Sequence, residues 1–291
     1  MATLAIDIGG TKIAIGLVKN DAIVERRQFP TPIVQQAEHF AGTILEHATD
    51  WIGQFSRIGI STTGLVTEQG ISAINPDTLA FPAPFPLVQA LEKLTKLPVA
   101  MLNDAQAAAW YEYTQLDNNT KNMAFITVST GVGGGIIING QLHSGATGLA
   151  GHVGHFSIDP NGPHCGCGQI GCVEAIASGT AIKRFSDAQF TPNISNIELF
   201  SLAQSNPIAN EIIEQSAKAI ATLCCNLKAT LDLDIVVLGG GVGLANTYLE
   251  RVQQHIVARP KAFQVTVVPA KGDYDACLLG AAFQFNKEEI W

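Results

Sequence analysis

The sequence predicts an α/β fold of two lobes, and three observations carry this prediction. The chain has 291 residues, 47% of them apolar, and a single hydrophobic core usually stops growing at roughly 250–300 residues. Short apolar strands alternate with stretches in which apolar residues recur every three to four positions, as helices require. Two glycine-turned hairpins open two stretches of comparable length, which indicates a weak internal duplication.

The first half of the chain begins with a predicted hairpin, in which Leu4–Val18 reads as two apolar runs around the turn Gly9-Gly10-Thr11. The proline-rich segment 76–86 is predicted to be an ordered loop or a lid edge. Apolar spacing predicts the other elements of this half, which are helices within 35–51 and 87–97 and strands at 57–61 and 99–102.

The second half repeats the opening plan, because Phe125–Ile138 again places a glycine-rich turn between two apolar runs. The chain then reads as mostly helical from 171 to 231, with a buried strand at 235–238 and a last helix at 275–285. The polar, turn-prone segment 117–122 predicts the boundary between the lobes. We therefore expect an N-terminal lobe of residues 1–116, rejoined by 275–291, and a C-terminal lobe of residues 117–274.

The charge and hydropathy of the chain exclude several classes of protein. Its 25 acidic residues outnumber its 17 basic ones, and the formal net charge of −8 argues against a surface that attracts nucleic acid or anionic lipid. No apolar run approaches the roughly 18 residues of a membrane span, and no basic segment precedes an apolar one at the start. These features predict a cytoplasmic protein that acts on small soluble molecules.

Three of the six cysteines lie within eight residues, at Cys165, Cys167 and Cys172. With His155 they supply the four nitrogen and sulfur ligands of a closed tetrahedral zinc site, which leaves no open position for catalysis. We therefore predict structural zinc. A redox pair and idle thiols are the alternatives, and His164 is a rival fourth ligand. The remaining set, Cys224, Cys225 and Cys277, lies in apolar helical stretches where cysteine behaves as a core residue.

Glycine-rich turns let backbone N–H groups approach phosphate oxygens, and the chain has three of them, at 9–12, 130–135 and 239–243. Any one of them could simply close a hairpin, but together they indicate a nucleotide site. The motifs G-x-x-x-x-G-K-[ST] and G-x-G-x-x-G and the protein-kinase triplets H-R-D and D-F-G are all absent. The remaining pattern resembles the actin-like (ribonuclease H-like) kinases, in which a hairpin from each lobe grips the phosphates.

The cysteine cluster makes the resemblance more specific. Gly154-His155, the spacing C-x-C-G-x-x-G-C-x-E and the glycine hairpins together are similar to the ROK family of repressors and sugar kinases, over essentially the whole chain. Repressor members carry a helix-turn-helix segment before the first hairpin, whereas this hairpin begins within six residues of Met1. We therefore expect the kinase branch, and the resemblance implies ATP with Mg²⁺, a sugar substrate and a homodimer.

The resemblance also gives roles to single residues. Asp104 would accept the proton of the attacking sugar hydroxyl, although an isolated Asn-Asp before a helix is more often an N-cap. His155 would serve both the zinc and the sugar. The sugar contacts implied are Gly64, Asn103, Asp104, His152, His155 and Glu174. The ATP contacts implied are Ala5, Ile6, Asp7, Ile8, Gly9, Gly10, Thr11, Lys12, Thr130, Gly131, Val132, Gly133, Gly134, Gly135 and Gly240.

One departure bears on the choice of sugar. Relatives that phosphorylate glucose show Glu-x-Gly-His at the zinc histidine, whereas this chain has His152 in place of the glutamate. The strings GLAGHVGH and CGCGQIGCVEAIASG resemble the family branch that phosphorylates N-acetylmannosamine in sialic acid catabolism. A glucokinase or a broader hexose or N-acetylhexosamine kinase is the alternative. From another class, an actin-like ATPase that binds protein partners would share the phosphate hairpins but would have no reason for Asp104 beside a zinc-ordered Glu174.

Overall fold

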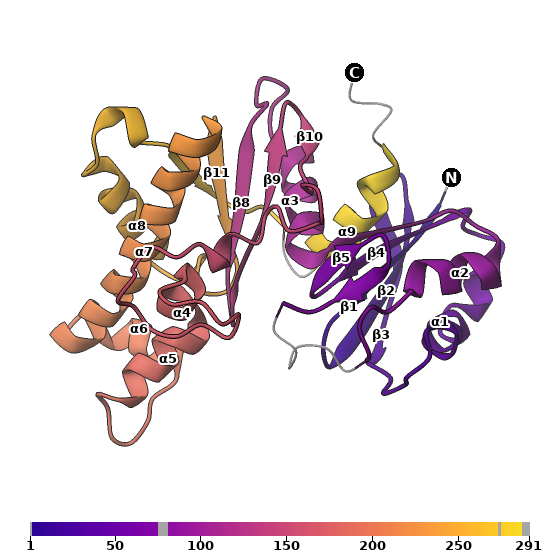
Figure 1. Cartoon of the computed structure of the whole chain (residues 1–291), viewed down its shortest axis with the longest axis horizontal. Helices are drawn as coiled ribbons and strands as arrows, with labels where there is room; N and C mark the ends of the chain where they lie inside the picture. The colour runs from indigo at the N-terminus through magenta and orange to yellow at the C-terminus, as the bar shows by residue number, and fades with distance from the viewer. Residues whose placement is uncertain (1, 75–80, 273–274, 287–291) are drawn as a thin grey trace. The chain divides into compact units, whose positions relative to one another are not determined.

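The computed structural model describes residues 2–74, 81–272 and 275–286, shown in Figure 1. Part of the predicted loop 76–86 and the end of the predicted segment 275–291 lie outside these residues. The chain forms two compact units. Unit 1 contains residues 1–114, 144–149 and 272–291, and unit 2 contains residues 115–143 and 150–271. Each unit contains a mixed β-sheet with helices, so the predicted α/β class and two lobes are confirmed.

Unit 1 contains a sheet in the strand order β3-β2-β1-β4-β7. Its strands are β1 (Thr3–Ile8), β2 (Lys12–Lys19), β3 (Ala22–Pro30), β4 (Arg57–Thr62) and β7 (Val99–Asn103). The pairing of β1 with β2 is antiparallel, which confirms the first predicted hairpin. Because β1, β4 and β7 are parallel and Ile8, Thr62 and Asn103 share one row of the register, their carboxyl ends lie together at one edge of the sheet.

Helices cover the sheet of unit 1. They are α1 (Ala37–Glu46), α2 (Leu87–Thr95), α3 (Asp104–Thr114) and α9 (Ala276–Phe283), with 3₁₀ turns at Thr49–Trp51 and Gln284–Asn286. Leu4, Ile6 and Ile8 form one core with the apolar residues of α1 and α2. Helix α9 approaches the sheet closely at Gly59, where a Cβ would lie 2.1 Å from the carbonyl oxygen of Ala281. A hairpin of β5 (Leu65–Thr67) and β6 (Gly70–Ser72) completes the unit.

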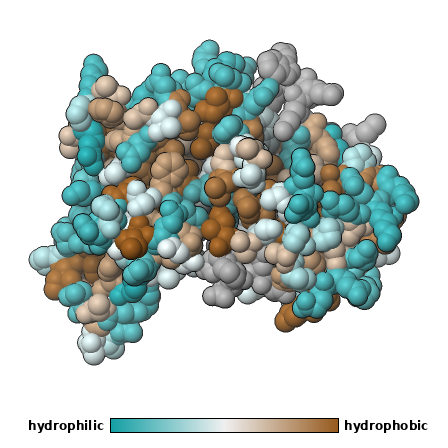
Figure 2. All heavy atoms as spheres, in the orientation of Figure 1, coloured by the Kyte–Doolittle hydropathy of each residue, from teal (hydrophilic) through white to brown (hydrophobic). Residues whose placement is uncertain are grey.

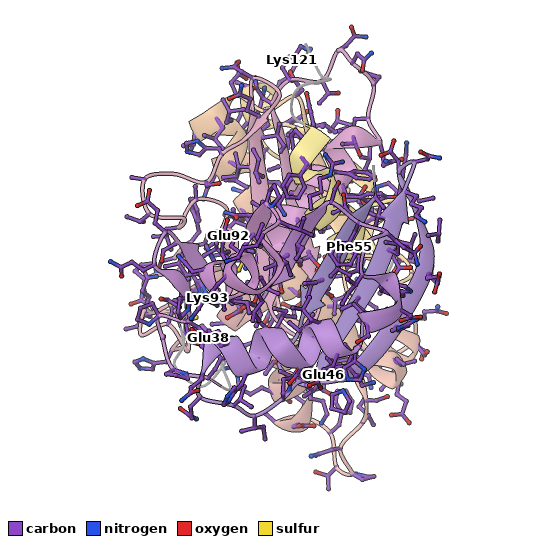
Figure 3. The ribbon with its side chains drawn as sticks, turned by 90° about the vertical axis from the view of Figure 1, so that its right-hand side faces the viewer. Glu38, Glu46, Phe55, Glu92, Lys93 and Lys121 are labelled. Carbon is purple, nitrogen blue, oxygen red and sulfur yellow. The ribbon has the colours of Figure 1, made fainter. Side chains whose placement is uncertain are left out.

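The outer sides of α1 and α2 are polar. Figure 3 shows Glu38 of α1 and Lys93 of α2 labelled near each other, and Oε1 and Nζ of this exposed pair are 3.6 Å apart. In Figure 2 the surface at the right of the view, over these helices, is mainly hydrophilic. This division of apolar and polar faces is what an amphipathic helix on a sheet requires.

Unit 2 contains a second sheet, in the strand order β10-β9-β8-β11-β12. Its strands are β8 (Met123–Val128), β9 (Val132–Ile138), β10 (Gln141–Leu142), β11 (Ile235–Gly239) and β12 (Thr266–Pro269). The antiparallel pairing of β8 with β9 confirms the second predicted hairpin. Strand β11 lies parallel to β8 on its other side, with Gly239 opposite Thr127.

The helices of unit 2 share one large apolar core with alternate residues of β8. They are α4 (Val173–Ala177), α5 (Gly179–Asp187), α6 (Asn196–Leu202), α7 (Pro207–Leu231) and α8 (Tyr248–Val257), with 3₁₀ turns at Val153–His155 and Lys261–Phe263. Helix α7 begins with a side-chain cap, because Asn206 accepts from the N–H groups of Ile208 and Ala209 and Pro207 is its first residue. Among the described residues, every helix is too short or too polar to cross a membrane.

Candidate functional site

The carboxyl edge of the sheet in unit 1 carries two carboxyl groups. Asp7 is the next-to-last residue of β1, and its Oδ1 accepts a hydrogen bond of 2.9 Å from the hydroxyl of Ser61 on β4. Burial raises the pKa of Asp7, and the Ser61 hydrogen bond partly offsets that rise. Asp104 follows β7 directly and is the first residue of α3. The parallel register therefore accounts for both carboxyl groups lying at one edge.

Asn103 fixes the turn from β7 into α3. Its Oδ1 accepts from the N–H of Ala105 at 3.0 Å and of Gln106 at 3.4 Å, which is the geometry of a helix N-cap. Its Nδ2 donates to the carbonyl of Gly64 at 2.8 Å, where a φ of 93° favours glycine. Asn103 therefore occupies the N-cap position, and Asp104 follows it as the first residue of α3, where its Oδ1 also accepts from the N–H of Ala105 at 2.8 Å.

The carboxyl group of Asp104 has an altered proton affinity. Its pKa is raised to about 6, chiefly because burial disfavours the charged form; the N–H of Ala105 lowers it and the charge of Asp7 raises it. A raised pKa means that the folded protein binds this proton more tightly than the unfolded chain does. Asp104 therefore lowers folding stability as the pH rises from about 4 through 6. A carboxyl group that lowers folding stability in this way is typical of a general base.

One neighbour of this edge was missed by the sequence analysis, which treated Cys277 as a core residue. Its thiol on α9 lies 3.6 Å from the carbonyl oxygen of Asp104. Burial and the charges of Asp7 and Asp104 raise the pKa of the Cys277 thiol well above its usual value, so it stays protonated. No local pattern in the sequence indicates this contact, because the two residues are 173 positions apart.

The first glycine turn, between β1 and β2, also belongs to unit 1. The N–H of Gly9 donates to the carbonyl of Lys12 at 3.0 Å, and the Thr31 hydroxyl donates to the carbonyl of Gly9 at 2.7 Å. In the described part of the chain, the N–H groups of Gly10 and Thr11 have no acceptor, and both residues are exposed. Ala5, Ile6 and Ile8 of the predicted ATP set have buried side chains, so they support this turn from the core.

The second glycine turn lies in unit 2 and is held by a helix. The N–H of Ser129 donates to the carbonyl of Gly131 at 2.9 Å. The first residues of α5 then donate to the turn, from Gly179 N–H to Ser129 at 2.7 Å and from Thr180 N–H to Thr130 at 3.1 Å. Within the described ranges, the N–H groups of Thr130 and Gly131 make no hydrogen bond. No local pattern in the sequence indicates this role of α5.

The third glycine cluster contacts the end of β8, the strand that leads into the second glycine turn. After β11 the chain turns at Gly240, where φ is 85° and a Cβ would lie 2.3 Å from the carbonyl oxygen of Val128. That carbonyl accepts from the N–H of Val242 at 2.9 Å and of Gly243 at 3.1 Å. The fold therefore brings the second and third predicted motifs together at the end of β8.

The zinc motif forms a compact group of ligands in unit 2. The ligand atoms of His155, Cys165, Cys167 and Cys172 all lie within 4.8 Å of one another. Cys165 Sγ is 3.7 Å from His155 Nδ1, and Cys167 Sγ is 3.7 Å from Cys172 Sγ. A tetrahedral zinc about 2.3 Å from each sulfur separates two sulfurs by about 3.8 Å. The donor set and its spacing therefore fit zinc, and the group includes His155 and not the exposed His164.

Two polar side chains flank the zinc ligands. Cys172 is the residue before α4, and Glu174 in the first turn of that helix accepts a hydrogen bond of 3.0 Å from the N–H of Val132. His152 precedes the turn that carries His155. Burial lowers the pKa of His152, which favours its neutral imidazole. Its Nε2 is buried and has no hydrogen-bond partner among the described residues.

Comparison with known proteins gives a consistent result over the full length. The sequence profile of the ROK family matches residues 3–288. An N-acetylmannosamine kinase of Vibrio vulnificus is 62% identical over 100% of both chains. One of Vibrio cholerae is 61% identical over 99% of this chain and 100% of its own length. One of Escherichia coli is 43% identical over 100% of both chains.

Solved structures agree with the fold described above. A ROK hexokinase from Thermus thermophilus matches with a TM-score of 0.84 and 31% identity, covering 99% of this chain and 100% of its own. A ROK glucokinase from Streptomyces griseus, in complex with glucose and AMPPNP, matches with a TM-score of 0.77 and 29% identity, over 98% and 99% of the two chains.

The ligand geometry leads to a prediction about metal content. Elemental analysis should find about one zinc per chain, and His155→Ala should lose it because only three ligands of the closed site remain. His164→Ala is the matched control, and it should keep the metal. A full zinc complement in His155→Ala, or loss of zinc in His164→Ala alone, would make His164 the ligand and contradict the assignment.

Proposed function

Because the chain belongs to the ROK family, we propose that it transfers the γ-phosphoryl group of ATP to the 6-hydroxyl of N-acetylmannosamine. The substrate rests on identities of 61–62%, over at least 99% of this chain, to N-acetylmannosamine kinases. Phosphoryl transfer rests on one observation above all, the carboxyl group of Asp104, whose pKa is about 6 at the edge where three parallel strands end.

Asp104 is the proposed general base. Phosphoryl transfer requires mainly positioning and charge stabilisation, with one group that takes the proton of the attacking hydroxyl. With a pKa of about 6, Asp104 is mostly ionised at neutral pH, yet it binds a proton more readily than an ordinary aspartate. Asn103 orients it, because the cap fixes where α3 begins. Asn103 is also the proposed sugar contact beside the base, as the family resemblance implies.

The exposed turns are the proposed phosphate contacts. Gly10 and Thr11 in unit 1, and Thr130 and Gly131 in unit 2, present N–H groups that the described residues leave without acceptors. Such groups bind phosphate oxygens well. Magnesium bound with ATP would neutralise part of the phosphate charge, and the glycine cluster at Gly240 would lie against the adenosine, as the family resemblance implies.

The residues around the zinc ligands are the proposed sugar contacts in unit 2. A zinc ion held by His155 and the three cysteines would fix the loop and leave His155 Nε2 for the sugar, because Nδ1 lies on the cysteine side. Glu174 is fixed by the same loop through Cys172. The buried Nε2 of His152 has no hydrogen-bond partner among the described residues. A sugar substituent is the proposed partner of this atom.

Replacement of the base tests the catalytic part of the proposal. Asp104→Asn keeps the side-chain shape but cannot accept the proton, so turnover measured by ADP release should fall by roughly 10² or more. AMPPNP and sugar binding should persist. Asp117→Asn, in an exposed turn, is the matched control and should keep full turnover. Near-native turnover in Asp104→Asn would remove Asp104 from the chemistry.

Sugar selectivity tests the substrate. We expect kcat/KM for N-acetylmannosamine to exceed that for glucose by roughly 10²-fold or more, because buried polar groups matched to one substituent penalise an analogue that leaves them unpaired. His152→Glu should narrow this difference, and His164→Glu should leave it unchanged. Glucose used as well as N-acetylmannosamine would instead favour a glucokinase, and ADP release that needs no sugar would favour an actin-like ATPase.

A further inference from the structure

The peptide groups of Val132 connect the second glycine turn with the zinc loop. The N–H of Val132 donates to Oε2 of Glu174, which lies two residues after the zinc ligand Cys172. The carbonyl oxygen of Val132 is contacted by Gly154, the neighbour of His155, where a Cβ would lie only 2.0 Å from that oxygen. Both peptide groups of Val132, the first residue of β9, are therefore in contact with residues close to zinc ligands: its N–H with Glu174 and its carbonyl oxygen with Gly154.

The Glu174 carboxylate also lies beside the turn itself. A Cβ built on Gly131 would lie 2.6 Å from Glu174 Oε2, so the absence of a side chain at 131 is what permits this approach. Thr130 and Gly131 are the residues whose N–H groups have no acceptor in the described structure. The sequence thus places a negative charge next to the turn proposed to hold the phosphates of ATP. Glu174 is half-buried, so salt screens its charge less than it screens an exposed charge.

We propose that Glu174 couples the two substrates: without sugar its carboxylate opposes nucleotide phosphates at the turn Thr130–Gly131, and sugar binding relieves this opposition. The inference rests on the proposed function, because it takes the turn as a phosphate site and Glu174 as a sugar contact. A sugar hydroxyl that donates to the carboxylate takes up part of its charge and competes with the N–H of Val132 for it. By linkage, bound nucleotide must then strengthen sugar binding by the same factor.

A purely structural role of Glu174 predicts a different outcome. In that role, Glu174 would only fix the start of β9 by accepting the hydrogen bond from Val132 N–H. Any residue that accepts this hydrogen bond could then replace it. Glu174→Gln keeps an acceptor oxygen for the N–H of Val132 but removes the charge, whereas Glu174→Ala removes both. The two variants therefore separate charge from bracing.

The experiment measures the Kd of Mg²⁺-AMPPNP by calorimetry on zinc-loaded protein, first with no sugar and then with saturating N-acetylmannosamine. In the wild type, sugar should tighten AMPPNP binding about 10-fold. Both Glu174→Gln and Glu174→Ala should bind AMPPNP about 10-fold more tightly than the wild type without sugar, and in both the effect of sugar should vanish. Glu250→Gln, an exposed change of the same kind on α8, should behave as the wild type.

Two outcomes would overturn the inference. In one, sugar-free AMPPNP affinity is unchanged in Glu174→Gln and weaker in Glu174→Ala, as bracing alone predicts. In the other, sugar does not change AMPPNP affinity in the wild type. A wild type that phosphorylates N-acetylmannosamine but gives either result leaves the proposed function standing, whereas a wild type that binds no AMPPNP contradicts both.

Discussion

The chemistry proposed for this protein depends on a carboxyl group that must be shielded from much of the water around it and still exchange a proton. The sheet of unit 1 meets this requirement with its register: β1, β4 and β7 end in the same row, and the chain enters α3 immediately after Asn103. Asn103 caps the helix, and Asp104 is the first helical residue, with its Oδ1 on the N–H of Ala105. Burial then raises the pKa of Asp104 and the nearby charge of Asp7 adds to the effect. Stability at neutral pH is lowered as a result.

Unit 2 meets a different requirement, which is to hold the turn Ser129–Gly131 in a fixed conformation with backbone N–H groups exposed. The first N–H groups of α5 bind the carbonyls of Ser129 and Thr130, so the helix satisfies its own orphan donors and holds the turn open. Val132 connects this turn to the residues beside His155 and Cys172. An ion at the cysteine cluster would therefore stabilise the proposed phosphate turn as well as the zinc loop, because the contacts of Val132 connect the two.

The sequence was sufficient where the pattern is local. Both hairpins, the strand before the late glycine cluster, and the group of His155 with three cysteines appear where spacing predicted them. It was insufficient where partners are distant along the chain. The Ser61 hydroxyl on Asp7 and the Cys277 thiol on Asp104 join residues 54 and 173 positions apart. Which member of Asn103-Asp104 caps α3 also needed the structure, because either residue type can cap a helix.

Burial gives Asp104 the proton affinity of a general base, and an NMR titration of its side-chain carboxyl carbon tests this most directly. The Asp104→Asn spectrum would assign the signal in the zinc-loaded, sugar-free protein. We expect a midpoint of about 6, well above the ordinary aspartate value of 3.8. A midpoint at or below 3.8 would show a solvated or ion-paired carboxylate and would contradict the account.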